Sequence, residues 1–367
     1  MKSNYDLLGN HIRLIDNRNK DLVTEQVLGI NIDKFFMPSV ANVIGTDLSK
    51  YKLIQKGNFA CNPMHVGRDE RLPVALYSED TPAIVSPAYF MFEIKDTTVL
   101  NADFLMMWFR RPEFDRICWL HTDGSVRGGI TWDDICRMEI PVPPIDEQIE
   151  IVSSYQAITE RIKLKKQIND NLEATAQAIY KKLFVEDVDI SELPQDWKLT
   201  ALENVASLSA GGDRPSVYSS FPTNICTVPI FSNGIDEEGL YGYTDKAKIF
   251  DESVTVSARG TVGYVFLREE PYVPIVRLIS VIPKTEYVTA KYLYFALASI
   301  DLHSTGTSQQ QITVPDFKQR LIVVPDRMTM DTFTKFIEPI FSKIKQNKSE
   351  IQSLLGLQAS FLALLSR

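Results

Sequence analysis

The stretches "GSVRGGITWDDICRMEIPVP" (residues 124–143) and "GTSQQQITVPDFKQRLIVVP" (residues 306–325) repeat one pattern half a chain apart. Each begins with glycine and a small hydroxyl residue, passes through Ile-Thr, and has an aspartate three residues after that threonine. Each closes on Ile-x-Val-Pro, and the offset between the copies is 182 residues throughout. A constant offset between similar segments indicates an internal repeat, so the chain is predicted to contain two related halves.

A long amphipathic helix is predicted after each copy of the pattern. Apolar residues recur at spacings of four and three from Ile151 to Leu183, and the positions 182 residues later are again mostly apolar. This spacing is typical of helices that pair through an apolar stripe. Polar residues interrupt the stripe at Lys165 and at its repeat mate Asn347, and they are predicted to fix the register of the helix pair. The alternative is that both side chains reach solvent and have no such role. Pro339 is expected to kink or delay the second helix.

The predicted organisation is domain, helix, domain, helix, over residues 1–146, 147–185, 186–326 and 327–367. Strand-like runs such as "PAIVSPAYFMFEI", "ESVTVSARGTVGYVFL" and "VRLISVIP" alternate with helical segments such as "NADFLMMWFRRPEFDRI" and "TAKYLYFALASI". The predicted fold class is α+β. It has two mixed α/β domains, each followed by a long helix, and the helices pair as an antiparallel coiled coil with pseudo-twofold symmetry. The middles of the domains barely align, and chance similarity of two amphipathic helices is the alternative to a repeat.

Composition places the chain among ordinary globular proteins. Hydrophobic residues make up 44% of the 367 residues and charged residues 23%, which are typical values. No apolar run is long enough to span a membrane, and the first residues do not resemble a signal peptide. The four scattered cysteines form no CxxC pair, so neither a zinc site nor a disulfide framework is expected. A soluble cytoplasmic protein with no membrane partner is predicted.

The net charge argues against a nucleic-acid partner, whereas the composition of several loops favours one. The net charge of −8 argues against a nucleic-acid partner, because such proteins usually present a basic face. Arginines nevertheless stand in the polar or glycine-rich loops "NPMHVGRDERLP", "GSVRGG", "GGDRPS" and "SARGTVG". A guanidinium can grip phosphate or read guanine through two parallel hydrogen bonds, and the amides of "SQQQ" can pair with adenine. The alternative is that these side chains are solvated or form salt bridges with the abundant acidic residues.

No catalytic residues and no metal site are predicted. The sequence has no GxxxxGK[ST] phosphate loop and no histidine cluster with metal-ligand spacing. "CNPMH" (residues 61–65) resembles the Asn-Pro-Pro-aromatic motif of amino-methyltransferases but lacks the second proline and the aromatic residue. "FEIK" (residues 92–95) and "PDFK" (residues 315–318) contain fragments of a nuclease carboxylate motif without a partner at a useful distance.

Stretches spread over nearly the whole chain resemble the specificity subunits of type I restriction–modification systems. They are "YDLLGNHIRLIDNRN", "NPMHVGRDE", "TDGSVRGGITWDD", "IPVPPIDEQ", "LPQDWKLTALENVASLSAGGDRP", "SNG" (residues 232–234) and "SARGTVG". The resemblance implies that each domain is a target-recognition domain for one half of a split site in double-stranded DNA. It also implies that the long helices space the half-sites and dock two methyltransferase subunits, with restriction and translocation subunits as further partners. The second copy departs from the first by "QQQ" in place of "RGG".

The resemblance further implies a specificity subunit that is not itself an enzyme and holds no cofactor. Methylation of adenine N6 by the methyltransferase subunits would use S-adenosylmethionine, and the restriction subunits would use ATP and Mg. Two dissimilar domains imply two dissimilar half-sites, so the target is expected to be bipartite and asymmetric. The predicted DNA contacts are His65, Arg68, Arg71, Arg127, Arg214, Asn233, Arg259, Gln309 and Gln310.

Two other functions stay open at this point. One is a self-contained DNA methyltransferase or nuclease, which would show methylation or cleavage of DNA by the purified chain alone. The other is a protein-only scaffold that bridges two copies of a partner. Salt-dependent binding of the assembled complex to duplex DNA would argue against such a scaffold.

Overall fold

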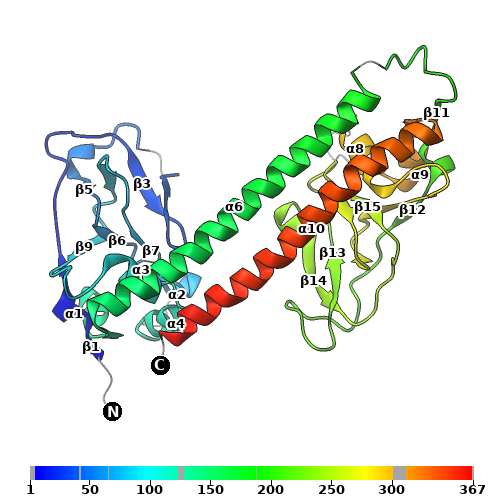
Figure 1. Ribbon diagram of the computed structural model, residues 1–367. Helices are drawn as coiled ribbons and strands as arrows, with labels where there is room; N and C mark the ends of the chain where they lie inside the picture. Colours follow the sequence, from blue (N-terminus) through cyan, green and yellow to red (C-terminus); the bar gives the residue numbers. More distant parts are fainter. Residues whose placement is uncertain are drawn as a thin grey trace. The chain divides into compact units, whose positions relative to one another are not determined.

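The computed structural model describes residues 5–40, 43–64, 66–122, 128–186, 188–300 and 311–365. The chain divides into two compact units (Figure 1). Unit 1 comprises Met1–Lys165 and Ser349–Arg367, and unit 2 comprises Lys166–Lys348. Each long helix therefore contributes one part to unit 1 and the other part to unit 2, whereas the predicted boundaries coincide with the ends of the helices.

Unit 1 consists of short strands and helices followed by the first part of a long helix. In chain order the elements are β1 (Tyr5–Leu7), α1 (Leu8–His11), β2 (Ile12–Leu14), β3 (Val27–Ile30), β4 (Phe36–Pro38), η1 (Leu48–Lys50), β5 (Lys52–Ile54), β6 (Phe59–Cys61), α2 (Val66–Asp69), β7 (Val74–Leu76), β8 (Ala83–Val85), β9 (Phe90–Ile94), α3 (Ala102–Phe109), α4 (Pro112–Leu120), α5 (Trp132–Cys136), β10 (Glu139–Pro141) and α6 (Ile145–Phe184). Asn101 caps α3, because its side chain accepts the N–H of Phe104 at 3.0 Å.

The core of unit 1 lies between a sheet and α3. The strand orders of its two four-stranded sheets are β2-β9-β6-β7 and β4-β3-β8-β5, and β1 pairs separately with β10. The rings of Phe59 and Phe92, on neighbouring strands, stack with centroids 5.1 Å apart. Phe109 of α3 meets both rings edge-on. Such aromatic packing excludes water from the centre of the unit and holds the strand ends in place.

Unit 2 contains the rest of α6 and a second set of short elements. In chain order these are β11 (Lys198–Ala201), α7 (Leu202–Val205), β12 (Ala206–Ala210), β13 (Val228–Phe231), η2 (Asp236–Gly239), β14 (Leu240–Thr244), β15 (Ser253–Val256), β16 (Val265–Arg268), β17 (Val273–Pro274), β18 (Ile279–Pro283), α8 (Ala290–Ala298), α9 (Val314–Lys318), β19 (Leu321–Val324) and α10 (Arg327–Leu364). The last part of α10 belongs to unit 1.

The strand topology of unit 2 repeats that of unit 1. The sheet β12-β18-β15-β16 has the order of β2-β9-β6-β7, and β11 pairs with β19 as β1 pairs with β10. In the other sheet, β13 lies between an antiparallel neighbour, β14, and a parallel neighbour, β17, as β3 lies between β4 and β8. The counterpart of β5 is reduced to an isolated bridge between Ile249 and Tyr272. The middles of the domains, which barely align in sequence, therefore share one topology.

The strand and helix predictions are confirmed in both units. "PAIVSPAYFMFEI" forms β8 and β9, "ESVTVSARGTVGYVFL" forms β15 and β16, and "VRLISVIP" contains β18. "NADFLMMWFRRPEFDRI" forms α3 and α4, and "TAKYLYFALASI" forms α8. The prediction of a mixed α/β domain before each long helix follows from these elements and is also confirmed.

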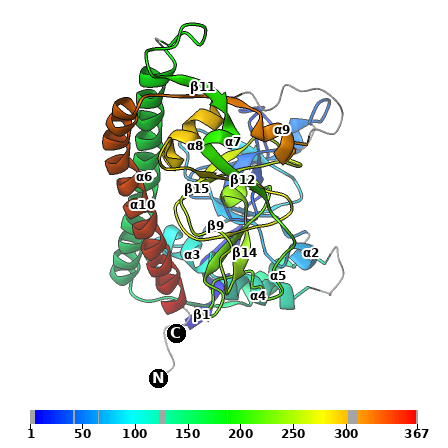
Figure 2. The ribbon, with the colours of Figure 1, turned by 90° about the vertical axis from the view of Figure 1, so that its right-hand side faces the viewer.

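The long helices run antiparallel within each unit (Figure 1 and Figure 2). In unit 1, Gln358 of α10 donates a hydrogen bond to Thr159 of α6 at 2.7 Å. Arg161, further along α6, donates to Glu350, which lies earlier in α10, at 2.7 Å. The residue numbers rise along one helix as they fall along the other, which is the predicted antiparallel pairing.

The same direction holds for the helix segments in unit 2. Asn347 of α10 donates to Asn169 of α6 at 2.8 Å, and the rings of Phe333 and Phe184 meet with centroids 5.2 Å apart. Pro339 lies inside α10, which begins at Arg327, so the proline does not delay the helix, and the expected kink stays a prediction. Its ring removes one backbone donor, while the apolar face of the helix remains packed in the core of unit 2. In the part of the chain that is described, no helix has the length and apolarity of a transmembrane segment.

Candidate nucleic-acid interface

Several of the predicted DNA contacts belong, in sequence, to segments that join equivalent elements of the two units. The loop between β6 and β7 (residues 62–73) carries His65, Arg68 and Arg71, and the loop between β15 and β16 (residues 257–264) carries Arg259. A second pair of equivalent loops precedes the short helices α5 and α9. In sequence, Arg127 precedes α5, and Gln309 and Gln310 precede α9; all three lie outside the described residues.

A backbone hydrogen bond at the same position ties the two segments together in each unit, and unit 1 adds a second bond from the N–H of Gly67 to the carbonyl oxygen of Gly128 at 3.0 Å. In unit 1 the N–H of Ile130 donates to the carbonyl oxygen of Pro63 at 3.1 Å. In unit 2 the N–H of Ile312 donates to the carbonyl oxygen of Ala258 at 3.0 Å. Ile130 and Ile312 are the isoleucines of the repeated Ile-Thr pair, so this part of the repeat fixes one candidate loop against the other.

The rest of the repeated pattern anchors the chain behind these loops. The side chain of Thr131 accepts the N–H of Asp134, and Asp134 accepts the N–H of Thr131 in return, which forms a capping box at the start of α5. Thr313 accepts the N–H of Asp316 at the start of α9. The Ile-x-Val-Pro segments overlap β10 and β19, which pair with the first strand of their own unit.

The side chain of Asn233 joins several loops of unit 2. Its Oδ1 accepts the N–H of Ala258 at 2.7 Å, and its Nδ2 donates to the carbonyl oxygen of Val276 at 2.7 Å. Its backbone oxygen accepts the hydroxyl of Thr261 at 3.2 Å. Because Ala258 and Thr261 flank Arg259, the loop that carries this arginine is fixed to the end of β13.

The loop that carries Arg214 is attached to the same network. The N–H of Val276 donates to Gly212 at 2.8 Å, and the N–H of Arg277 donates to Gly211 at 3.0 Å. A side chain at Gly211 would come within 2.7 Å of the backbone of Pro274 and Ile275, so the close approach of these segments requires glycine. Val276 and Arg277 both have positive φ, 53° and 62°.

Four exposed basic residues surround this network. They are Arg214, Lys248, Arg259 and Arg277. The guanidinium of Arg214 lies over the ring of Tyr218 at 4.6 Å, and Lys248 Nζ lies 4.0 Å from the position that a side chain on Gly212 would occupy. Within the described part of unit 2, no salt bridge engages any of the four. Their charges are therefore available to a phosphate or a base.

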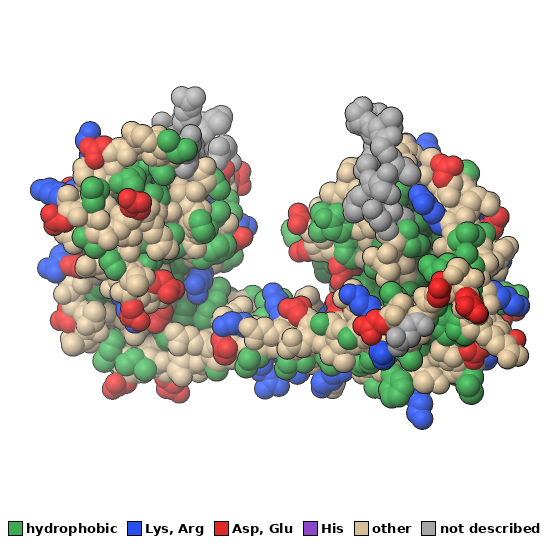
Figure 3. All heavy atoms as spheres, turned by 90° about the horizontal axis from the view of Figure 1, so that it is seen from above, with side chains coloured by type: hydrophobic (Ala, Val, Ile, Leu, Met, Phe, Trp, Pro, Cys, Tyr) green, Lys and Arg blue, Asp and Glu red, His purple; other side chains and the backbone are tan. Residues whose placement is uncertain are grey.

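Sequence reasoning missed Lys248 and Arg277. Arg277 follows an apolar strand and has no glycine next to it, so it lacked the signal that identified the other arginines. The left-handed backbone conformation of Arg277, which places this residue beside the Asn233 network, cannot be predicted from the sequence. On the face seen in Figure 3, basic and acidic side chains are interspersed rather than gathered into one basic field, in keeping with the negative net charge.

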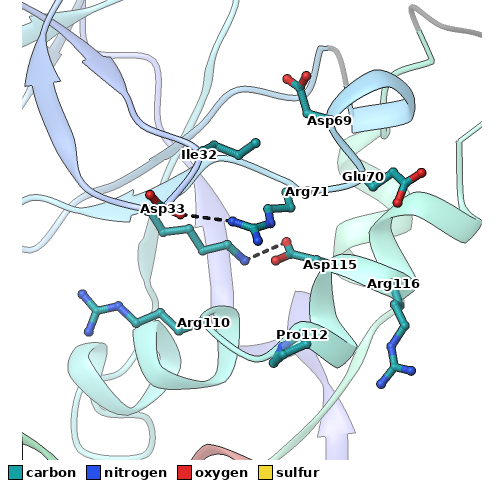
Figure 4. Close-up of a pocket in the computed structure, with 10 residues that line it drawn as sticks. Ile32, Asp33, Asp69, Glu70, Arg71, Arg110, Pro112, Asp115 and Arg116 are labelled. Atoms are coloured by element: carbon teal, nitrogen blue, oxygen red, sulfur yellow. Dashed lines mark hydrogen bonds and ion pairs between the residues drawn. The ribbon is translucent and has the colours of Figure 1, made fainter. Parts of the chain in front are cut away.

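The corresponding region of unit 1 contains a charged pocket of about 560 Å³ (Figure 4). Arg71 at its edge forms an ion pair with Asp33 at 3.0 Å, and both side chains remain more than half exposed. Lys34 is buried in the wall, where its ammonium donates to Asp115 at 2.7 Å. Burial lowers the pKa of Lys34, and the negative charge of Asp115 opposes that shift. In unit 1 an ion pair thus connects the segment after β3 with the β6–β7 loop, where unit 2 uses an asparagine.

Comparison with known proteins decides the family. Residues 194–354 match the family model described as the type I restriction modification DNA specificity domain. The C-terminus of a putative type I specificity subunit of Mycoplasma pneumoniae is 36% identical over 100 residues, which are 27% of this chain and 68% of that relative. The chain belongs to the family of type I specificity subunits.

Further relatives of this specificity subunit match over longer stretches. Another putative type I specificity subunit of Mycoplasma pneumoniae is 27% identical over 246 residues, so the match covers 66% of this chain and 65% of that relative's length. The solved type I restriction–modification S subunit from M. genitalium has a TM-score of 0.59 and 15% identity, with 98% of this chain and 95% of that chain covered. A chain from a structure that addresses complex assembly and conformational transition of the type I R-M system has a TM-score of 0.50 and 17% identity. These structures share the fold.

The structure describes some of the predicted DNA contacts of the specificity subunit and not others. His65, Arg127, Gln309 and Gln310 lie outside the described residues, and so does the side chain of Arg68. Arg214, Asn233 and Arg259 come together around one network in unit 2, and Arg71 lies on the pocket of unit 1. Their roles as DNA contacts stay predictions. Among the residues described, no group of three or more His, Cys, Asp or Glu side chains is arranged to hold a metal.

The two predicted register residues have polar contacts within their own units. In unit 1 the ammonium of Lys165 lies 2.9 Å from a carboxylate oxygen of Glu350. In unit 2 Asn347 is fully buried and donates to Asn169. A buried amide pair in an apolar seam favours one register, because any other register would leave the amides unpaired. Their influence on the helix pair stays a prediction.

Proposed function

We propose that this chain is the sequence-specific DNA-recognition subunit of a type I restriction–modification complex. Each domain reads one half of a bipartite, asymmetric target in double-stranded DNA. The long helices hold the half-sites at a fixed spacing and dock two methyltransferase subunits, and restriction subunits join this assembly. The observation that carries the proposal is the duplicated domain, in which the same hydrogen bond ties together loops of different sequence. One scaffold with two different sets of loop residues suits two different half-sites.

The chemistry of the loops supports DNA as the ligand. Exposed guanidinium groups bind phosphates and the O6 and N7 atoms of guanine, and glutamine amides pair with adenine. In sequence, "RGG" precedes α5 where "QQQ" precedes α9, so the two domains are expected to prefer different bases. The negative net charge does not oppose this function, because affinity depends on the local charge that faces the DNA.

The chain is proposed to act without catalytic residues and without a cofactor of its own. The methyltransferase subunits bind S-adenosylmethionine and methylate adenine N6, and the restriction subunits bind ATP and Mg. The specificity subunit positions these partners on the target. Its contribution to the reaction is the choice of DNA sequence.

The test is to map methylated adenines across the genome in cells with and without this gene. We expect one split, asymmetric motif to be methylated on both strands only when the gene is present. The purified chain alone should show neither methylation nor cleavage of DNA. Activity of the isolated chain would favour a self-contained enzyme. An unchanged methylation map, together with salt-insensitive behaviour of the assembled complex on duplex DNA, would favour a protein-only scaffold.

A further inference from the structure

The strongest unexplained feature of unit 2 is the use of both polar atoms of one asparagine within the protein. A side-chain amide that reads a base must offer its oxygen and its nitrogen to the DNA. In Asn233 the oxygen accepts the N–H of Ala258, and the nitrogen donates to the carbonyl oxygen of Val276, both at 2.7 Å. These two bonds take one of the two hydrogen-bonding positions of each atom and fix the orientation of the amide, so the side chain is held by the protein and is not free to turn toward a base edge.

We propose that Asn233 is a positioning residue, which sets the loop geometry for DNA recognition by Arg259 and Arg277 and does not contact DNA itself. This inference rests on the proposed function. It replaces the prediction from the sequence that Asn233 is a DNA contact, and it gives the "SNG" segment a structural role in the reading surface.

The position of Asn233 between two loops supports this role. On one side, Ala258 immediately precedes Arg259, and Thr261 after it donates to the backbone oxygen of Asn233 at 3.2 Å. On the other side, Val276 immediately precedes Arg277. One side chain therefore holds the residue before each of two exposed arginines. Loss of the amide would remove its hydrogen bonds to Ala258 and Val276, while backbone bonds such as that from the N–H of Ile275 to Phe231 would remain.

Backbone conformation on the Val276 side adds to the argument. Val276 is β-branched and has φ of 53°, a conformation that β-branched residues rarely adopt. Its N–H donates to Gly212 and its carbonyl oxygen accepts from Asn233, so both polar groups of its backbone are held. Strained backbone persists only where its surroundings fix it, and such positions cluster at functional sites. Asn233 is one of the groups that fix this position.

The chemistry of asparagine is required for this role. Aspartate has the same shape and keeps an acceptor for the N–H of Ala258, but it places an oxygen against the carbonyl oxygen of Val276. Alanine removes both hydrogen bonds. Asn233→Asp therefore removes only the hydrogen bond to the loop of Arg277, whereas Asn233→Ala also removes the hydrogen bond to the loop of Arg259. Asn224, an exposed asparagine on another loop of unit 2, provides a matched control.

The first measurement is hydrogen exchange of the full chain without DNA. We expect Asn233→Ala to speed exchange in the segments that contain Ala258 and Val276. Asn233→Asp should speed exchange around Val276 and leave the amide of Ala258 protected, and Asn224→Ala should change neither segment. Unchanged exchange in both Asn233 variants would overturn the proposal. This readout does not depend on the proposed function.

The second measurement is a double-mutant cycle in the complex with methyltransferase subunits. Affinity is measured for a duplex that contains the motif found by the methylation map and for duplexes in which one base pair of that motif is altered. We expect Asn233→Ala and Arg259→Ala each to weaken binding to the motif by about tenfold or more, in the range for loss of one base contact. If Asn233 acts through Arg259, the double variant binds no more weakly than the weaker single variant. The pair Asn224→Ala and Arg259→Ala should bind like Arg259→Ala alone.

Multiplicative effects of the Asn233→Ala and Arg259→Ala changes would mean that Asn233 contacts the DNA independently, and the proposal would be wrong. Equal binding of the wild-type complex to all duplexes would instead contradict the proposed function. If Asn233→Ala does not yield folded protein, Asn233→Asp, which keeps one of the two hydrogen bonds, takes its place in the cycle. Wild-type exchange and wild-type affinity of Asn233→Asp would then overturn the proposal.

Discussion

The backbone N–H of Ile312 donates to the carbonyl oxygen of Ala258 across 3.0 Å and thereby joins the loop before α9 to the loop that carries Arg259. The equivalent bond in unit 1, from Ile130 to Pro63, has nearly the same length. The repeated pattern in the sequence therefore specifies an attachment between loops. It leaves the residues on the loops free to differ, which is what two domains with different half-sites require.

The threonine caps of this pattern are expected to stabilise each unit. Thr131→Ala removes the side-chain acceptor at the start of α5, and Thr313→Ala does the same at α9. Loss of an N-cap of this kind costs about 0.5–2 kcal/mol. Each variant should lower the midpoint of chemical unfolding of the intact chain, and Thr131→Ser should restore most of the loss. Thr97→Ala, at an exposed threonine outside any helix, serves as the control. A change no larger than that of Thr97→Ala would mean that the caps do not contribute.

The cap in unit 1 should also make stability depend on pH. The hydrogen bond from Thr131 is the main cause that lowers the pKa of Asp134 from its ordinary value of 3.8. A carboxylate with a lowered pKa in the folded state contributes stability above its ordinary pKa, and the contribution is lost as pH falls through the lowered value. The stability difference between wild type and Asp134→Asn should therefore be constant from pH 7 to about pH 5 and shrink below pH 4. Unfolding midpoints measured across this range give the comparison. A difference that grows on acidification would contradict the lowered pKa.

The sequence predicts the parts of the fold that depend on local pattern. The spacing of apolar residues identified both long helices, and the alternation in "ESVTVSARGTVGYVFL" identified β15 and β16. The common topology of the two middles was not predictable, because β3 ("VLGI") and β13 ("VPIF") are too short and too different for an alignment to match them. The two strands are equivalent because each has a parallel neighbour, β8 for β3 and β17 for β13, and each neighbour is distant from its partner in the sequence.

The candidate site shows the same limit. Arg214 and Arg259 were found because glycines accompany them. Arg277 became a candidate only when the positive φ of Val276 and Arg277 and their bonds to Gly211 and Gly212 were visible. Asn233 was identified by its motif, but its contacts with Ala258 and Val276 come from two separate loops, so no local pattern reveals them.

The amide pair between the long helices of unit 2 is expected to fix the register of these helices and to lower the stability of the chain. Asn347→Leu alone leaves the amide of Asn169 without this partner, which costs about 1–3 kcal/mol. Replacing both residues by leucine removes the unpaired group, so the double variant should unfold at or above the wild-type midpoint. Methylation of targets with a spacer one base pair longer or shorter should then become detectable. Strict wild-type spacing in a double variant of raised stability would show that the pair does not set the register.

The last prediction separates base contacts from phosphate contacts around the Asn233 network. Arg259 stands on a loop held at both sides by Asn233, so we expect its guanidinium to read a base. Arg259→Ala should cost about 1–3 kcal/mol of binding to the motif and relax the preference at one position. Lys248 carries a compact charge on a flexible stem, which suits a phosphate.

Lys248→Ala should weaken binding equally for all sequences and reduce the slope of log affinity against log salt by about 0.9, the value for one phosphate contact on duplex DNA. Lys198→Ala, at an exposed lysine on β11 outside the network, controls for the loss of one positive charge. Binding is measured with the assembled complex at several salt concentrations, on the motif and on duplexes altered at each position in turn. The assignment fails if Lys248→Ala changes the sequence preference, or if Arg259→Ala changes only the salt slope. The first outcome would make Lys248 a base contact, and the second would make Arg259 a phosphate contact, since phosphate contacts carry no sequence information, whereas a bidentate base contact distinguishes bases by its geometry.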